Sequence, residues 1–241
     1  MEEVTIKINK TALFLVAGLI VGAGLGYYAG ANRTPAVAKN PGGTQVVANN
    51  QPSPADSGSA PAEKIIVTKD DNITGAKNPQ VYLVEFSDFQ CPYCKKFHPT
   101  MQQIIKEFGN KVAWVYRHFP LSSQQNAQIA AEASECASEQ GKFWEYGDLL
   151  FAKGSGDGTG LTPPDLEKYA RDLGLNGDKF DSCLASKKYA GKVGADQVSG
   201  SAAGVNGTPG TVLIDKNGNQ NLISGAVSYE ELKTAIQAAL Q

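Results

Sequence analysis

The architecture of this chain follows from one segment, Val81-Tyr-Leu-Val-Glu-Phe-Ser-Asp-Phe-Gln-Cys91-Pro-Tyr-Cys94-Lys-Lys-Phe-His98. Its apolar start, residues 81–86, predicts a buried β-strand. Pro92 suits the first position of a helix, where its missing N–H costs nothing. Cys91 then lies at the helix N-terminus, where free N–H groups and the helix dipole lower the pKa of a thiol. Cys94 follows one turn later, close enough to attack a mixed disulfide on Cys91, so the segment predicts thiol–disulfide exchange.

Strand and helix signals continue on both sides of this segment. The helix is expected to cover residues 92–108, with a kink at Pro99, and a second buried strand is expected at 112–116. A strand–helix–strand unit of this length predicts a right-handed parallel crossover. Upstream, the sequence predicts a first strand at 64–68 and a loop over 70–79.

The second half of the chain changes from helices to a hairpin. From residue 121 to about 205, small and apolar residues recur at helical spacing and predict several helices. Two short apolar runs, 211–214 and 219–223, flank Asn217-Gly218 and predict a β-hairpin. Ser228-x-x-Glu231 is a capping box, which predicts the start of a final helix. The expected order is therefore β-β-α-β, then helices, then β-β-α.

Four stretches carry a resemblance to a known family. They are Phe86-Ser-Asp-Phe-Gln-Cys-Pro-Tyr-Cys94, Tyr116-Arg-His-Phe-Pro-Leu121, Gly141-Lys-Phe-Trp-Glu-Tyr146 and Gly207-Thr-Pro-Gly-Thr-Val-Leu-Ile-Asp215. From about residue 63 to its end, the chain resembles the thioredoxin superfamily and, within it, the DsbA-like thiol:disulfide oxidoreductases. The resemblance implies an α/β thioredoxin fold over residues 63–120 and 206–241, with an α-helical domain inserted at 121–205.

The resemblance also implies roles for the residues around the cysteine pair. Cys91 is expected to be the exposed nucleophile, paired with Cys94 in a redox-active disulfide. Pro209 is expected to be cis, since X–Pro bonds tolerate that isomer, and to lie against the disulfide with the backbone of Thr208 free to pair with an extended substrate. Pro92 and Tyr93, between the cysteines, are expected to contact substrate. DsbA relatives often carry His at the position of Tyr93, which implies a milder oxidant here.

Three further ionisable residues need an interpretation. Glu85 interrupts an apolar strand, and burying a carboxylate is costly unless it is neutral or paired. The resemblance implies that Glu85 relays protons near Cys94, and a solvent-exposed place at a strand edge is the alternative. His98 is expected to be a surface or packing residue. His118 is expected to be structural rather than catalytic.

The other two cysteines, Cys136 and Cys183, lie in two of the predicted helices. In an exported protein, two remaining cysteines are expected to form a bridge, and buried free thiols are the alternative. A bridge that closes a loop of this length would stabilise the fold by about 4 kcal/mol in the chain-entropy model. There is no second Cys-x-x-Cys, so Cys91 and Cys94 lack the further ligands of a zinc site. No metal is expected.

The N-terminal part of the chain differs from the rest in composition. Residues 11–31 carry no charge and are apolar, and their length can span a bilayer. They predict an uncleaved transmembrane anchor, with residues 1–10 in the cytoplasm. A cleaved signal peptide is the alternative, because Ala29-Gly-Ala31 is a small-x-small site. Residues 32–62 are rich in Pro, Ala, Asn, Gly and Ser and predict a flexible linker.

Composition and resemblance together give a functional hypothesis. A formal net charge of −2 at pH 7 gives no indication of nucleic-acid binding. The N-terminal stretch and the resemblance together predict a membrane-anchored, monomeric, extracytoplasmic oxidoreductase that introduces disulfide bonds into exported proteins and needs no cofactor. Its partners would be reduced, unfolded exported proteins and a DsbB-like or vitamin-K-epoxide-reductase-like membrane protein that reoxidises it. A disulfide reductase or isomerase and a non-enzymatic, peptide-binding chaperone are the alternatives.

Overall fold

The computed structural model describes residues 63–241. The predicted cytoplasmic segment 1–10, anchor 11–31 and linker 32–62 lie outside the described residues. Within residues 63–241, none of the helices combines the length and the apolar character that a membrane span requires.

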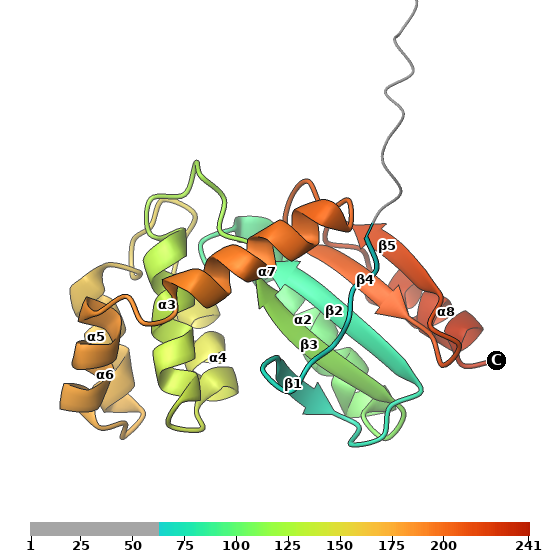
Figure 1. Cartoon of the computed structure of the whole chain (residues 1–241), viewed down its shortest axis with the longest axis horizontal. Coiled ribbons are helices and arrows are strands. Elements are labelled where there is room, and N and C mark those ends of the chain that lie inside the picture. Colours follow the sequence, from blue (N-terminus) through green and yellow to red (C-terminus); the bar gives the residue numbers. More distant parts are fainter. Residues whose placement is uncertain (1–62) are drawn as a thin grey trace, which may run out of the picture. The chain divides into compact units, whose positions relative to one another are not determined.

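A five-stranded mixed sheet forms the centre of the described part (Figure 1). Its strands, in spatial order, are β1 (Asn72–Gly75), β3 (Val112–His118), β2 (Val81–Ser87), β4 (Gly210–Ile214) and β5 (Gln220–Ser224). Strands β2 and β3 are parallel, and the other three pairs are antiparallel. The parallel pair confirms that the two strands are joined by a parallel connection, because a helix lies between them in the chain. Strand β2 is therefore central, with a neighbour on each side.

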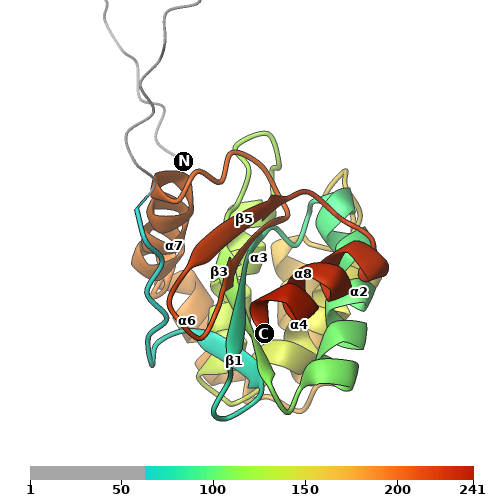
Figure 2. The same cartoon turned by 90° about the vertical axis from the view of Figure 1, so that its right-hand side faces the viewer.

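Helices cover both faces of this sheet. On one face lie α2 (Pro92–Phe108) and α8 (Tyr229–Ala239), and on the other lies α7 (Ala190–Ala202) (Figure 2). Both faces are buried, which is why residues 81–86 read as a continuous apolar run rather than an alternating one. Gly200 lets α7 approach closely, because a Cβ there would lie 2.7 Å from a ring carbon of Phe86.

Between β3 and β4 the chain forms five helices. They are α3 (Ala127–Ser138), α4 (Phe143–Lys153), α5 (Pro163–Asp172), α6 (Gly177–Ala185) and α7. Helices α3 to α6 pack together beside the sheet, and α7 runs from them back across it (Figure 1). One apolar cluster joins these helices to the α2 face of the sheet. A second cluster fills the α7 face.

The first strand is not where the sequence placed it. Residues 64–68 form no strand, and β1 lies in the segment predicted to be a loop. Ile65 packs in the cluster on the α7 face, which accounts for the apolar pattern. Its N–H and C=O, however, bond to the side-chain amide of Gln220 at 2.8 and 2.7 Å. The amide side chain of Gln220 therefore takes the place of a neighbouring strand. The strand propensity of residues 64–68 cannot show whether their backbone will bond to a strand or to a side chain.

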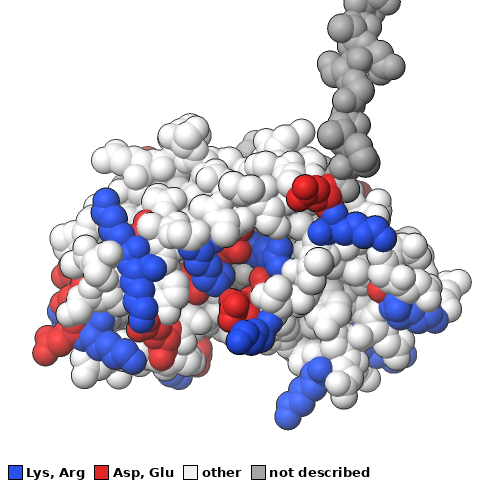
Figure 3. Space-filling view, in the orientation of Figure 1, with Lys and Arg blue, Asp and Glu red and all other residues white. Residues whose placement is uncertain are grey.

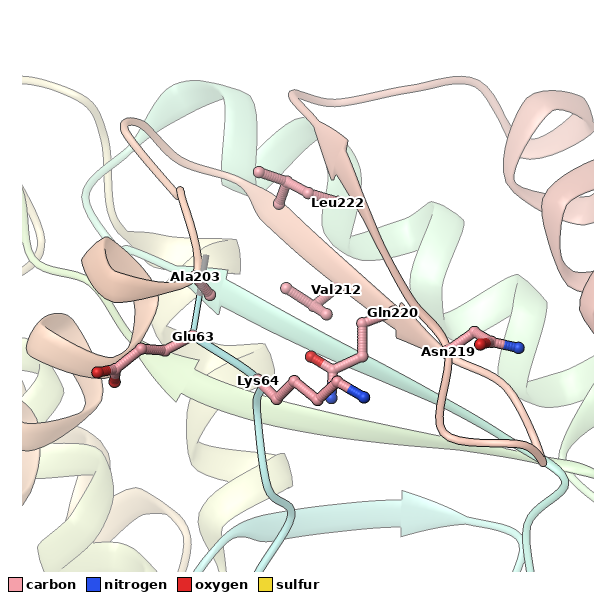
Figure 4. Close-up of a pocket in the computed structure, with 7 residues that line it drawn as sticks. All are labelled: Glu63, Lys64, Ala203, Val212, Asn219, Gln220 and Leu222. Atoms are coloured by element: carbon pink, nitrogen blue, oxygen red, sulfur yellow. The ribbon is translucent and has the colours of Figure 1, made fainter. Parts of the chain in front are cut away.

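Figure 4 shows Gln220 beside Lys64 at this place, within a pocket of about 340 Å³. Val212 and Leu222 supply apolar parts of its wall, and Glu63 and Lys64 supply charged ones. Neither Cys91 nor Cys94 lines this pocket.

Candidate active site

The loop that connects β2 to the start of α2 is held in place by hydrogen bonds of its side chains. The Asp88 carboxylate accepts the N–H of Gln90 at 2.8 Å with one oxygen and the N–H of Leu121 at 3.0 Å with the other. The side chain of Gln90 accepts the N–H of Asn126 at 2.7 Å and donates to the carbonyl of Gly156 at 3.2 Å. Two buried polar side chains therefore fasten this loop to the helical segment that follows β3.

The two sulfurs lie below the molecular surface at the first turn of α2. Cys91 is the N-cap residue and is only 3% exposed, and Cys94 is fully buried. The expectation of an exposed nucleophile is therefore wrong. The Thr208 carbonyl oxygen lies 3.5 Å from the Cys91 sulfur and covers it from one side. Tyr93, between the two cysteines, is 66% exposed.

A groove gives access to Cys91 from the surface. It has a volume of about 240 Å³ and lies between the start of α2 and the loop after α4. Its walls are formed by the residues Phe89, Gln90, Pro92, Lys95 and Gly154–Gly156. Lys95 donates to the carbonyls of Ala152 and Gly154 at 3.3 and 2.8 Å, which holds the far wall in place.

The environment makes the two thiols chemically different. The pKa of Cys91 is lowered to about 5, chiefly by the neighbouring Cys94 thiol and against the effect of burial, with further contributions from the Thr208 hydroxyl and the N–H groups of Cys94 and Tyr93. Burial raises the pKa of Cys94, and an adjacent Cys91 thiolate and the Glu85 carboxylate raise it further. At neutral pH, Cys91 is therefore a thiolate and Cys94 a thiol.

The loop before β4 lies against this pair. The Thr208–Pro209 peptide bond is cis. The carbonyl of Pro209 accepts the N–H of Gly225 at 2.8 Å, which ties the loop to the end of β5. The Thr208 hydroxyl oxygen is buried, and it acts on the Cys91 sulfur, whose pKa it helps to lower.

Glu85 lies beneath the cysteines in the central strand. It is 1% exposed, so the alternative of a solvent-exposed strand edge is wrong. Burial raises the pKa of Glu85 to about 6, and the neighbouring Ser87, His98 and Trp114 limit this increase. A carboxyl with this pKa exchanges a proton readily near neutral pH.

Both histidines are buried and paired with carboxylates. His98, expected to be a surface or packing residue, is buried with Nε2 2.6 Å from Asp148 on α4. His118 Nε2 lies 2.8 Å from Glu135 on α3. The sequence analysis missed Asp88 and Asp148. The carboxylate of Asp88 accepting the N–H two residues on is a turn signal that could have been recognised, whereas nothing local to Asp148 points to His98.

Cys136 and Cys183 form a disulfide that joins α3 to α6. Both residues lie within the apolar cluster that includes Phe143 and Phe180. Within the part of the chain that the structure describes, no group of three or more His, Cys, Asp or Glu side chains could hold a metal ion.

Comparison of sequences connects this site with known proteins. Residues 67–238 match the sequence model of a family described as Thioredoxin. The Na(+)/H(+) antiporter NhaA 3 of Salinispora tropica is 37% identical over 170 residues, which cover 70% of this chain and 24% of that protein. The NhaA 1 antiporter of Salinispora arenicola matches with the same identity and coverage. The chain thus spans about a quarter of the length of the curated relatives it matches.

Solved structures share the fold at lower sequence identity. BdbD from Bacillus subtilis, in its oxidised form, has a TM-score of 0.64 at 23% identity, covering 75% of this chain and 98% of that one. DsbA2 of Pseudomonas aeruginosa has a TM-score of 0.60 at 23% identity, with coverages of 73% and 96%. A periplasmic thioredoxin-like protein from Salmonella enterica serovar Typhimurium has a TM-score of 0.57 at 23% identity, with coverages of 71% and 90%.

Proposed function

From the premise that this chain belongs to the thioredoxin family and has the fold of its DsbA-like members, we propose that it introduces disulfide bonds into exported proteins. One observation carries the proposal: Cys91 has a pKa lowered to about 5 and lies beside a thiol, Cys94, whose pKa is raised. A stabilised thiolate favours the reduced enzyme, which makes the Cys91–Cys94 disulfide an oxidant.

The reaction proceeds in two exchanges. A substrate thiolate attacks the Cys91 sulfur of the enzyme disulfide, forming a mixed disulfide. Cys94 leaves as a thiolate and takes a proton from Glu85. The second substrate thiolate then attacks the substrate sulfur of the mixed disulfide, and Cys91 leaves as its stabilised thiolate. The substrate has lost two electrons and gained a disulfide, and the enzyme holds a dithiol.

The surroundings of Cys91 suit an unfolded polypeptide as substrate. Three loops meet at the site: 119–126, bonded to Asp88 and Gln90; 154–161, which lines the groove; and 203–210, which carries Thr208. Together they contain one charged residue, Asp157. The upper edge of the molecule in Figure 3 is likewise almost free of charged side chains. A rim with a single charged side chain accepts extended chains of varied sequence.

Location and partners complete the proposal. We place residues 1–10 in the cytoplasm, 11–31 in the membrane and 32–62 as a linker. The thioredoxin-like domain comprises 63–120 and 206–241, with the helical domain 121–205 inserted. A structural disulfide between Cys136 and Cys183 suits an oxidising compartment. A DsbB-like or vitamin-K-epoxide-reductase-like membrane protein would remove the two electrons. The antiporter activity named for the curated relatives belongs to much longer proteins and is not carried over.

A redox titration of the full-length chain in glutathione buffers tests the direction of the reaction. We expect a reduction potential more positive than about −200 mV, towards that of the strong oxidant DsbA rather than that of thioredoxin, near −270 mV. A value near that of thioredoxin would instead indicate a reductase. Refolding of a reduced, disulfide-requiring substrate provides the second measurement. If Cys91→Ala refolds it as well as the native chain does, the protein acts as a chaperone and the oxidase proposal fails.

A further inference from the structure

Polar atoms without partners gather beneath the cysteine pair. Besides His118 and Thr211, five side chains on the α2-facing side of the sheet and on α2 itself each bury a polar atom that has no hydrogen-bond partner among residues 63–241. They are Glu85 Oε2, Ser87 Oγ, His98 Nδ1, Trp114 Nε1 and Tyr116 OH. Buried polar atoms in native proteins are nearly always satisfied, so such a concentration around one carboxyl needs a functional explanation.

His98 lies at the edge of this cluster, and its two ring nitrogens have different surroundings. It follows Cys94 by four residues in α2, so both side chains lie on the same helix face. Its ring packs against Trp114 and Phe151, with centroids 5.4 and 4.6 Å away, which fixes its orientation. Nε2 contacts Asp148, and Nδ1 is the buried, unpartnered atom. With Nε2–H donating to the carboxylate, Nδ1 presents a lone pair towards the interior.

Asp148, the residue that His98 Nε2 contacts, lies at the molecular surface. Its side chain is 50% exposed, and it also accepts a hydrogen bond from Gln102 at 3.0 Å. Asp148, Gln102 and Trp114 border a surface pocket of about 250 Å³. No residue of this pocket lines the groove at Cys91. The contact therefore opens to solvent at a place separate from the one where substrate reaches Cys91.

We propose that His98 and Asp148 form a proton conduit that connects Glu85, beneath the cysteine pair, with solvent on the α4 side of the molecule. The proposal rests on the proposed thiol–disulfide exchange and adds to it a route for the proton of Cys94. A mixed disulfide fills the groove at Cys91, so a proton that enters or leaves while substrate is bound needs another path.

The transfer balances in both directions. When Cys94 closes onto a mixed disulfide at Cys91, its thiol gives its proton to the Glu85 carboxylate. Glu85 passes a proton to His98 Nδ1, directly or through a bridging water, and His98 Nε2 releases its own proton to Asp148 and solvent. The new Cys91–Cys94 bond replaces the bond from Cys91 to the leaving thiolate. In substrate oxidation, the same groups return a proton to Cys94.

The groups that face His98 are consistent with this role. The titratable ones are Cys94, four residues earlier on its own helix, Glu85 from β2, whose raised pKa is lowered in part by the ring, and Asp148 from α4. The others that pack on the ring are the aromatic side chains of Trp114 from β3 and Phe151 from α4. The aromatic side chains beside His98 offer no other acceptor for a proton. A proton is therefore confined to the three ionisable groups Glu85, His98 and Asp148.

Reaction of the reduced, full-length chain with dithiobis(nitrobenzoate) separates the two sulfurs. Cys91 attacks the reagent and releases one thionitrobenzoate; Cys94 then displaces the second and forms the enzyme disulfide. We expect Asp148→Asn and His98→Gln to leave the first release within about twofold of the native rate and to slow the second about tenfold, a modest share of what positioned proton transfer contributes. Asp148→Glu should restore the second release.

Glu145→Gln is the matched control, because Glu145 lies on the same helix, also has a 50% exposed side chain, and loses the same charge. Asp148→Asn alters a surface side chain, so it tests the conduit even if His98→Gln does not fold. The proposal is overturned if Asp148→Asn leaves the second release at the native rate, or if Glu145→Gln slows it equally. A slow first release in the native chain would instead contradict the proposed function, because it would show that Cys91 is an ordinary thiol.

Discussion

The two cysteine pairs of this chain show how much the surroundings of a sulfur determine its chemistry. Cys91 and Cys94 are free thiols three residues apart on one helix, while Cys136 and Cys183 are 47 residues apart in sequence and bonded. Both pairs lie in the same apolar cluster. The first pair, however, also borders Glu85 and the Thr208 hydroxyl, and these groups act on the pKa values of its two thiols.

The contrast indicates that apolar burial alone does not produce a reactive cysteine. In the first pair, the free N–H groups at the start of α2 stabilise one thiolate, and a buried carboxylate beside the second thiol opposes its ionisation. In the second pair, the bond closes a long loop and so restricts the unfolded chain. We therefore propose that the first pair exchanges electrons, and we expect the second to contribute stability.

The largest effect expected is the loss of exchange in Cys91→Ala. The variant removes the only thiol with a lowered pKa in the described part of the chain, and Cys94 has no means of replacing it because its own pKa is raised. Reduction of a fluorescent disulfide substrate by the reduced protein, followed in time, should fall to the uncatalysed rate. As a control, the double variant Cys136→Ala/Cys183→Ala should exchange at nearly the native rate. If Cys91→Ala exchanged as fast as this double variant, the proposed difference between the two cysteine pairs would be contradicted.

The next effect concerns stability. Replacing both Cys136 and Cys183 by Ala should lower the free energy of unfolding by about 4 kcal/mol, because the loop between α3 and α6 is no longer closed in the unfolded chain. Urea unfolding followed by circular dichroism measures it. The alkylation rate of Cys91 should stay the same in this variant. A large change in that rate would show that the two pairs are coupled and that the comparison between them fails.

Glu85→Gln should make the protein more stable and its redox site slower. A carboxyl whose pKa is raised from 4.5 to about 6 favours the unfolded state once pH exceeds 4.5, and the cost is complete above pH 6. At pH 7, the variant should therefore gain about 2 kcal/mol, and the gain should vanish below about pH 4.5. Unfolding curves at several pH values measure this. The exposed carboxylate of Glu145 provides a control, and the same gain in Glu145→Gln would contradict burial as the cause.

The smallest effect is expected for Thr208→Val. Valine has nearly the same shape but lacks the hydroxyl that lies beside Cys91 and helps to lower its pKa. The pKa of Cys91 should rise modestly from about 5 towards its ordinary value, which thiolate absorbance in the ultraviolet measures against pH. Thr234→Val on α8 is the control, because it also replaces a threonine hydroxyl, and it should leave the pKa of Cys91 unchanged. An unchanged pKa in Thr208→Val would show that the N–H groups and Cys94 suffice.

Much of the fold was predictable because its signals are local. The bounds of α2 were predicted closely, since Pro92 starts the helix and Gly109 follows its end. The hairpin of β4 and β5 was predicted from Asn217-Gly218, and the start of α8 from the Ser228 cap. Strand β1 was missed because Asn72–Gly75 is only four residues long, begins with Asn and ends with Gly, and is ordered by pairing with β3.

The site was predictable to a lesser degree. The chemistry of Cys91 and Cys94 and the cis bond before Pro209 were expected from motifs, and the structure has the cis bond and a lowered Cys91 pKa. The burial of Cys91 was not expected, because the groups that cover it come from a loop more than one hundred residues away. Asp148 had no local signal at all, since only the packing of α4 on α2 brings it to His98.

Sequence alone determined which residues form helices and strands around the cysteine motif, and which two sulfurs are placed to exchange. These properties depend on neighbours within a few residues: a proline at a helix start, a turn dipeptide, a capping serine. Tertiary structure decided which sulfur is covered, which carboxylate is buried beneath it, and which histidine contacts a solvent-exposed carboxylate. Those outcomes depend on distances between elements far apart in the chain, and such distances are set by packing and not by any local preference.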